Sequence, residues 1–108
     1  MSGANRVLFR AAVFVIVRDE EDKVLLLKRA GSGFMDGYYD FPSGHVDEGE
    51  GFVDAAVREL AEEAGLMVRA EDLKLVHANV NVTDYPYINI VFEATHWQGE
   101  PKIMEPQK

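Results

Sequence analysis

The sequence predicts an α+β domain in which several β-strands and one helix share a single core. Apolar runs rich in β-branched and aromatic residues, typical of strands, occur before residue 30 and after residue 72. Between them, residues 52–64 carry apolar side chains at helical spacing. A length of 108 residues suits one domain. Strands on both sides of one helix favour an α+β fold or a mixed α/β sandwich.

The N-terminal part is expected to form two strands and a short extended segment. Residues 7–17 read as a largely buried strand and residues 24–27 as a second one. The charged residues 19–23 between them suit a hairpin tip. After a glycine-containing loop, residues 38–41 are expected to be extended, because Pro42 restricts the residue before it to β or polyproline geometry.

The helix is expected over about residues 52–64, with Gly65 as a left-handed C-terminal cap. Because an α-helix turns about 100° per residue, Glu59, Glu62 and Glu63 fall within about a third of its circumference. Like charges at this spacing destabilise an isolated helix by about 0.2–0.5 kcal/mol per pair, and a divalent cation is the simplest compensation. A different arc carries the apolar stripe, which consists of Val53, Ala56, Val57, Leu60 and Ala64.

Two more strands are expected after the helix. Residues 73–82 alternate sufficiently for a strand, residues 84–86 read as a turn, and residues 87–95 form the last strand. No internal repeat, low-complexity tract or linker divides the chain, so one domain over residues 1–108 is predicted.

Composition excludes several classes of function. The chain has no cysteine, which excludes disulfides, thiolate zinc sites and cysteine nucleophiles and fits a reducing cytoplasm. The longest apolar run, residues 11–17, is too short to span a bilayer, and no signal-peptide cleavage site follows it. A net charge of −8 disfavours a nucleic-acid partner. It would also repel a small polyphosphate unless a bound cation reversed the local charge.

Residues 44–66 resemble the Nudix box of the MutT-like Nudix hydrolase family, and every position of the pattern is matched. The alternative interpretation, a solvated acidic helix face, is the usual meaning of a charge run. It is disfavoured because such a face does not need the two glycines or the arginine at these spacings. The matching residues are Gly44, Glu50, Arg58, Glu59, Leu60, Glu62, Glu63, Gly65 and Leu66.

The resemblance implies an α/β/α sandwich with a mixed sheet and the loop-helix-loop motif on one side. Family domains usually continue past a turn like that at residues 98–99 into another strand and a C-terminal helix, whereas this sequence stops at Lys108. The domain is therefore expected to be C-terminally short and to lack both elements. Because an uncovered sheet face or edge invites pairing with another chain, a homodimer is predicted.

The resemblance also implies a metal site. The residues that match the family's ligands are Glu59, Glu62 and Glu63, with the carbonyl of Gly44 able to join them and Glu50 often assisting. Mg²⁺ is the expected cofactor and Mn²⁺ a substitute, because both prefer oxygen ligands.

Three further roles are expected. In the family, the arginine that matches Arg58 pairs with a motif glutamate. On an ideal wheel it lies away from the acidic arc, so it should reach Glu50 or a loop acid. Glu59 is the preferred general base and Glu93 the reserve, although Glu93 reads more simply as an exposed strand residue. Arg29 matches a position that often contacts substrate phosphate, with a surface charge as the equal alternative.

The implied reaction is Mg²⁺-dependent hydrolysis of the pyrophosphate linkage in a nucleoside diphosphate derivative. Residues 34–38 and 41–46 look like those of small members that convert an NTP or dNTP to NMP and pyrophosphate. Alternatives are an ADP-ribose or dinucleotide pyrophosphatase and a nucleotide-sensing module without turnover. A structural cation-binding protein is remote, because no EF-hand pattern is present. The expected partner is a small nucleotide, with no nucleic acid and no membrane.

Overall fold

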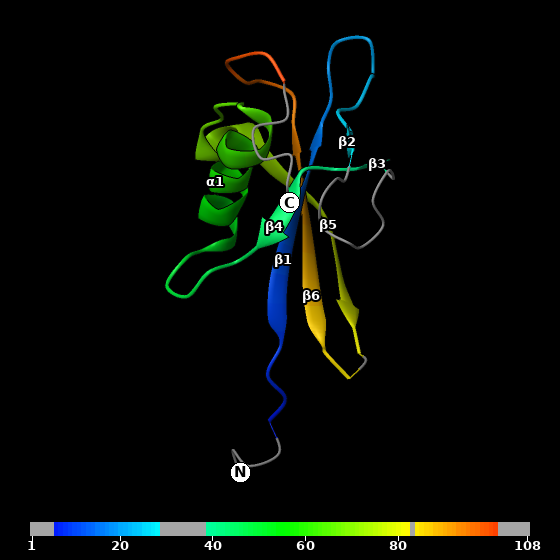
Figure 1. Ribbon diagram of the computed structural model, residues 1–108, viewed down its shortest axis with the longest axis vertical. Helices are drawn as coiled ribbons and strands as arrows, with labels where there is room; N and C mark the ends of the chain where they lie inside the picture. The colour runs from blue at the N-terminus through cyan, green and yellow to red at the C-terminus, as the bar shows by residue number, and fades with distance from the viewer. Residues whose placement is uncertain (1–5, 29–38, 83, 102–108) are drawn as a thin grey trace.

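A computed structural model of the chain describes residues 6–28, 39–82 and 84–101, and it contains a mixed sheet with α1 against one face (Figure 1). The spatial order of the four strands is β4-β1-β6-β5. β1 and β6 run parallel, whereas the β4/β1 and β6/β5 pairs are antiparallel. The predicted α+β class is therefore confirmed. The strands are β1 (Arg10–Val17), β4 (Ser43–His45), β5 (Leu73–Asn81) and β6 (Tyr87–Ala94).

Two smaller elements complete the described architecture. A separate two-stranded sheet pairs β2 (Leu27–Lys28) with β3 (Tyr39–Asp40). A short 3₁₀ helix, η2 (Ala70–Asp72), precedes β5.

The helix α1 spans Phe52–Ala64, as the apolar periodicity predicts. It ends where Gly65 adopts a left-handed conformation with φ 71°. The amide of Gly65 donates to the carbonyl of Ala61 at 3.2 Å, which is the bond of an αL cap, and the amide of Leu66 donates to the carbonyl of Leu60 at 3.3 Å. This cap fixes the end of the helix that carries the acidic residues.

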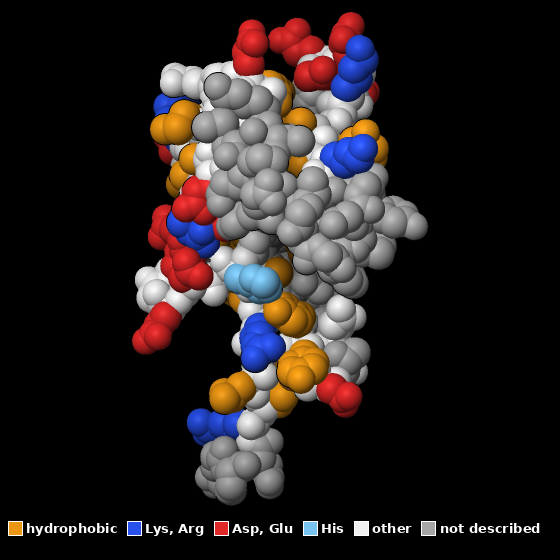
Figure 2. Space-filling model, in the orientation of Figure 1, with side chains coloured by type: hydrophobic (Ala, Val, Ile, Leu, Met, Phe, Trp, Pro, Cys, Tyr) orange, Lys and Arg blue, Asp and Glu red, His pale blue; other side chains and the backbone are white. Residues whose placement is uncertain are grey.

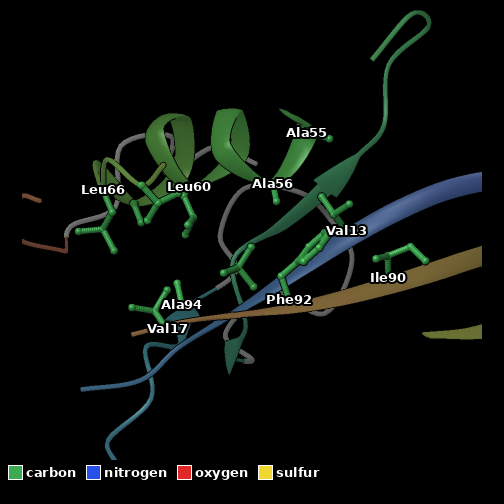
Figure 3. Packing of buried hydrophobic residues seen from close by; sticks show 12 residues of the cluster. Val13, Val17, Ala55, Ala56, Leu60, Leu66, Ile90, Phe92 and Ala94 are labelled. Carbon is green, nitrogen blue, oxygen red and sulfur yellow. The ribbon is translucent and has the colours of Figure 1, made fainter. Parts of the chain in front are cut away.

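The core lies between α1 and the sheet face beneath it (Figure 3). Alternate residues of β1 and β6 point toward the helix, as the two-residue period of a strand requires. The apolar stripe of the helix meets them, and its fully buried members come from successive turns. The main contacts are made by Val13, Val15, Val17, Ile90, Phe92 and Ala94 from the strands and by Ala56, Leu60 and Ala64 from the helix.

The N-terminal strands are shorter than predicted. β1 begins at Arg10 rather than at residue 7. The segment 24–27 contributes one bridge, between Arg18 and Val24, and only its last residue joins β2. The hairpin tip itself is as expected, since a carboxylate oxygen of Asp19 accepts the amides of residues 21 and 23, both at 2.9 Å. The predicted strands were too long because apolar composition does not show where a strand stops pairing with its neighbour.

β5 is an edge strand of the four-stranded sheet, and its residues are largely solvent-exposed. Leu75 and Val80 are 57% and 51% exposed. In the described ranges α1 is the one α-helix, and it covers β1 and β6 rather than β5. The predicted dimer stays a prediction. None of the helices in these ranges has the length and apolarity needed to cross a bilayer.

Candidate active site

The helix α1 and the edge strand β4 are in contact, and at Gly44 the strand backbone lies directly against a side chain of the helix. A methyl group added to Gly44 would overlap the carboxyl group and Cγ of Glu59. Glu59 is only 4% exposed although it is charged. Buried charges require compensating partners. A glycine is needed at position 44 because the absence of a side chain leaves space for the Glu59 carboxylate against the backbone of the strand.

Arg58 is the centre of the charged cluster beside this contact. Its Nε and Nη2 donate to the two carboxylate oxygens of Glu50, at 2.7 and 3.0 Å. Its Nη1 donates to Glu59 at 2.6 Å and to Glu62 at 3.0 Å. Nη2 also lies 3.5 Å from a carboxylate oxygen of Asp47. The bidentate pair with Glu50 is the geometry for which a planar guanidinium is suited.

These contacts confirm what was expected of the Arg58 side chain. It reaches Glu50, as predicted, and it pairs with motif glutamates. It also contacts Glu59 and Glu62 on the acidic arc, although its own position on the helical wheel is away from that arc. Helical-wheel angles describe Cβ directions, whereas a long arginine side chain can curve around the helix and join two arcs.

The charged cluster around Arg58 has an excess of negative charge. One guanidinium lies within ion-pair distance of four carboxylates, so the formal charge of these five groups is 1 − 4 = −3. Figure 2 shows acidic side chains gathered around basic atoms on the α1 side of the molecule. The hydrogen bond to Glu50 is the main reason that the pKa of Arg58 is raised. The same hydrogen bond, helped by the amide of Asp47, lowers the pKa of Glu50 from 4.5 to about 2.

The pKa of Glu50 predicts a pH dependence of stability. A lowered pKa means that the ionised carboxylate stabilises the folded state. That contribution is complete above about pH 4.5 and is lost as the pH falls toward about 2. In urea unfolding between pH 2 and 7, the stability difference between wild type and Glu50→Gln should be constant above pH 5 and should shrink below it.

Glu48→Gln, which changes an exposed carboxylate in the same loop, is the control for Glu50→Gln. Because Glu48 is not one of the four carboxylates paired with Arg58, Glu48→Gln should not reproduce the profile of Glu50→Gln. Equal profiles for the two variants would contradict the assignment of the effect to the ion pair with Arg58.

A cavity of about 390 Å³ opens beside the cluster. All three residues of β4 contribute to its lining. Glu63 reaches into this lining and accepts the amide of Ser43 at 2.9 Å. Glu62 contacts Arg58 but does not line the cavity. The lining consists of Ser43, Gly44, His45, Asp47, Arg58, Glu59 and Glu63.

The donor set at the cavity fits a hard divalent cation. Its side chains offer carboxylate oxygens, and the described ranges contain no cysteine. These ranges contain no ready-made group of three acidic or histidine ligands, because the glutamates point to Arg58 and to the Ser43 amide. A carboxylate has about four lone-pair positions, so a cation can share these groups with their present donors.

One of the other candidate residues, Glu93, lies elsewhere. Glu93 is on β6, between two residues that face α1, so its side chain is on the opposite sheet face. There its carboxylate pairs with Nε of Arg18 at 3.0 Å, and Glu93 does not line the cavity. Arg29 lies outside the described residues.

Sequence reasoning missed the backbone groups of the site and one side chain. The amide of Ser43 holds Glu63, and the carbonyl of His45 accepts from Nη2 of Arg58 at 3.0 Å. Tyr87, which contacts His45, is 42 residues away in sequence. Backbone hydrogen bonds carry no sequence signature, and a pairing at this separation depends on strand order and register.

Comparison with known proteins gives a consistent result. The sequence profile of the NUDIX domain matches residues 8–107. An RNA pyrophosphohydrolase of Psychrobacter cryohalolentis is 43% identical over 68 residues, covering 63% of this chain and 37% of the relative. An 8-oxo-dGTP diphosphatase of Escherichia coli is 29% identical over 96 residues, covering 85% and 70%. An ADP-ribose pyrophosphatase of Methanocaldococcus jannaschii is 36% identical over 91 residues, covering 83% and 53%.

A solved structure shares the fold. A MutT NUDIX hydrolase from Burkholderia pseudomallei superposes with a TM-score of 0.80 at 24% identity, covering 94% of this chain and 78% of that one. The chain therefore spans most of that structure, but little more than a third of the length of the Psychrobacter relative.

Proposed function

We propose that this chain, which belongs to the Nudix family, is a Mg²⁺-dependent pyrophosphohydrolase that converts an NTP or dNTP to NMP and pyrophosphate. One observation carries the proposal. A cluster with a formal charge of −3 borders a cavity whose wall includes the buried Glu59. Because like charges oppose one another at short range, this arrangement is favourable when a divalent cation and a polyphosphate enter together.

Glu59 and Glu63 would hold the cation, with Glu62 and the carbonyl of Gly44 completing the protein's share of the ligands. A bound divalent ion supplies charge neutralisation on phosphate oxygens and makes water more acidic. The chain's own groups do the rest. Arg58 fixes the carboxylates of Glu59 and Glu62, and the amide of Ser43 fixes Glu63. Fixed ligands matter because catalysis of this kind depends on position.

Glu59 is proposed to accept the proton of the attacking water. Its carboxylate lines the cavity and is nearly excluded from bulk solvent, and Nη1 of Arg58 anchors one of its oxygens. A base must lie within hydrogen-bond reach of the proton that it removes. Glu93 is disfavoured for this role because it faces the other side of the sheet and pairs with Arg18.

The charge of the chain and the names of its relatives bear on the substrate class. A net charge of −8 disfavours a long RNA, whose binding depends on neutralising many phosphates. The Escherichia coli relative, whose length this chain covers by 70%, acts by its name on a deoxynucleoside triphosphate, which supports the first proposal. ADP-ribose is the second candidate, because the archaeal relative that carries this substrate in its name has the higher identity of 36%.

The test is a substrate panel with defined products. The protein is incubated with NTPs, dNTPs, 8-oxo-dGTP, ADP-ribose and dinucleoside polyphosphates, with Mg²⁺ and with EDTA, and the phosphate products are identified by ³¹P NMR. Formation of NMP and pyrophosphate that requires Mg²⁺ is the expected result. AMP and ribose phosphate from ADP-ribose would support the second candidate. Nucleotide binding without any turnover would contradict both and favour a sensing module.

A separate prediction concerns metal affinity. Glu62→Gln and Glu63→Gln should each weaken Mn²⁺ binding, measured by calorimetry in the presence of a non-hydrolysable nucleotide, by about tenfold or more. The loss of one carboxylate charge from the ligand set is the reason. Glu71→Gln removes a surface carboxylate on η2 and should leave the affinity unchanged. Equal affinities in all three variants would remove these two glutamates from the metal site.

A further inference from the structure

His45 links Arg58 of the charged cluster to Tyr87 on β6. Its backbone carbonyl accepts the Nη2 proton of Arg58 at 3.0 Å. Its ring nitrogen Nε2 lies 3.0 Å from the hydroxyl of Tyr87, and the two rings are 5.8 Å apart at a 36° tilt. We propose that Tyr87 is a positioning residue, which fixes His45 and thereby holds Arg58 and Glu59 in place. The expected effect of Tyr87 on catalysis rests on the proposed function, whereas its positioning of Arg58 does not.

The strand register explains how Tyr87 reaches β4. β1 separates β4 from β6, so the two strands are about 10 Å apart, which is two strand spacings. Ala12 on β1 pairs with His45 on one side and with Asn89 on the other. Tyr87 lies two residues before Asn89 and therefore on the same face. Because alanine is small, the His45 and Tyr87 side chains can meet across it. A large side chain at position 12 would separate them.

The contact between His45 and Tyr87 would limit the movement of β4, which has few other constraints. The strand has only three residues, and in the described part of the chain no strand pairs with its outer edge. Its last residue is His45, immediately before the loop that carries Asp47 and Glu50. A small shift of the strand at this point would move the carbonyl that holds Arg58. Displacements of about 1 Å in a positioning network reduce turnover by about 100-fold in unfavourable cases.

The catalytic test uses Tyr87→Phe, which keeps the ring and removes the hydroxyl. On the best substrate of the panel, kcat should fall about tenfold while KM changes by less than about twofold, because the loss affects geometry rather than substrate contact. His45→Ala should cause a similar loss, and Tyr87→Phe should add nothing in the His45→Ala background. Tyr85→Phe removes a hydroxyl from a more exposed tyrosine beside the same strand and is the matched control.

A second measurement needs neither metal nor nucleotide. In ¹⁵N NMR spectra of the free protein, rotation about the guanidinium bonds of Arg58 should be slow in the wild type and in Tyr85→Phe, and faster in Tyr87→Phe. This readout distinguishes failure of the inference from failure of the proposed function. If no nucleotide is hydrolysed but Arg58 is loosened in Tyr87→Phe, the proposed function is wrong and the positioning role stands.

Three results would overturn the inference. The first is unchanged Arg58 dynamics in Tyr87→Phe. The second is a raised KM with normal kcat, which would mean that Tyr87 contacts the substrate. The third is an equal loss of activity from Tyr87→Phe in the wild-type and His45→Ala backgrounds, which would mean that the tyrosine does not act through the histidine.

Discussion

Glu59→Gln is expected to reduce turnover at least 100-fold (~10²–10⁴) while leaving the fold intact. Glutamine has nearly the same shape, and its amide oxygen can still accept from Nη1 of Arg58, so the packing at Gly44 is preserved. It cannot accept a proton from water, and it removes one of the four negative charges around Arg58. The effect should therefore appear mainly in kcat.

Glu93→Gln is the comparison for this prediction, because Glu93 is the other candidate base and lies on the opposite face with Arg18. Steady-state kinetics of both variants, with circular dichroism to verify folding, should show a large loss for Glu59→Gln and a loss below about threefold for Glu93→Gln. Near-normal turnover in Glu59→Gln would exclude it as both base and essential ligand. A large loss in Glu93→Gln alone would reverse the assignment.

The helix was predictable from sequence because its determinants are local. The apolar stripe, the acidic arc and the cap at Gly65 lie within the helix or one residue beyond it, and each depends on the 3.6-residue period or on the freedom of glycine to take φ 71°. The second strand was not predictable in the same way. Residues 24–27 are as apolar as a strand, but pairing in this region depends on partners at Arg18 and in β3.

The candidate site was also predictable only in part. The spacing in residues 44–66 predicted roles for Gly44, Arg58 and Glu59 and a contact between Arg58 and Glu50, but it did not show that Arg58 joins Glu50 to Glu59 or that Ser43 holds Glu63. The contact between Ser43 and Glu63 comes from the placement of β4 against α1, which is a tertiary property. Tyr87 was beyond sequence reasoning for the same reason: the small Ala12 and the strand order bring it to His45.

Gly44→Ala is expected to damage the site without any backbone strain. Among the glycines that the structure describes, those with positive φ are Gly49, Gly65 and Gly99, and Gly44 is not one of them. Its added methyl group would instead overlap the carboxyl group and Cγ of Glu59, a side chain that is 4% exposed. The carboxylate must then move, and its hydrogen bond to Arg58 with it. A loss of stability of about 1–3 kcal/mol is expected from the overlap, and a fall in kcat of about 10- to 100-fold from the displaced carboxylate.

Gly51→Ala is the matched control for this substitution. Gly51 has φ −81°, and a methyl group there would meet only a carboxylate oxygen of Asp54 at the ordinary distance of 3.7 Å. Gly51→Ala should lower the free energy of unfolding by about 1 kcal/mol or less, because it changes the helix N-cap, and it should leave kcat unchanged.

A double-mutant cycle isolates the cause of the Gly44→Ala effect. In a Glu59→Ala background the carboxyl group is absent, so Gly44→Ala should cost less than about 0.5 kcal/mol in urea unfolding. If Gly44→Ala is equally destabilising with and without the Glu59 side chain, the overlap is not the cause. Gly44 would then be required by the strand β4 itself. The space that it leaves beside the helix would not be what positions Glu59.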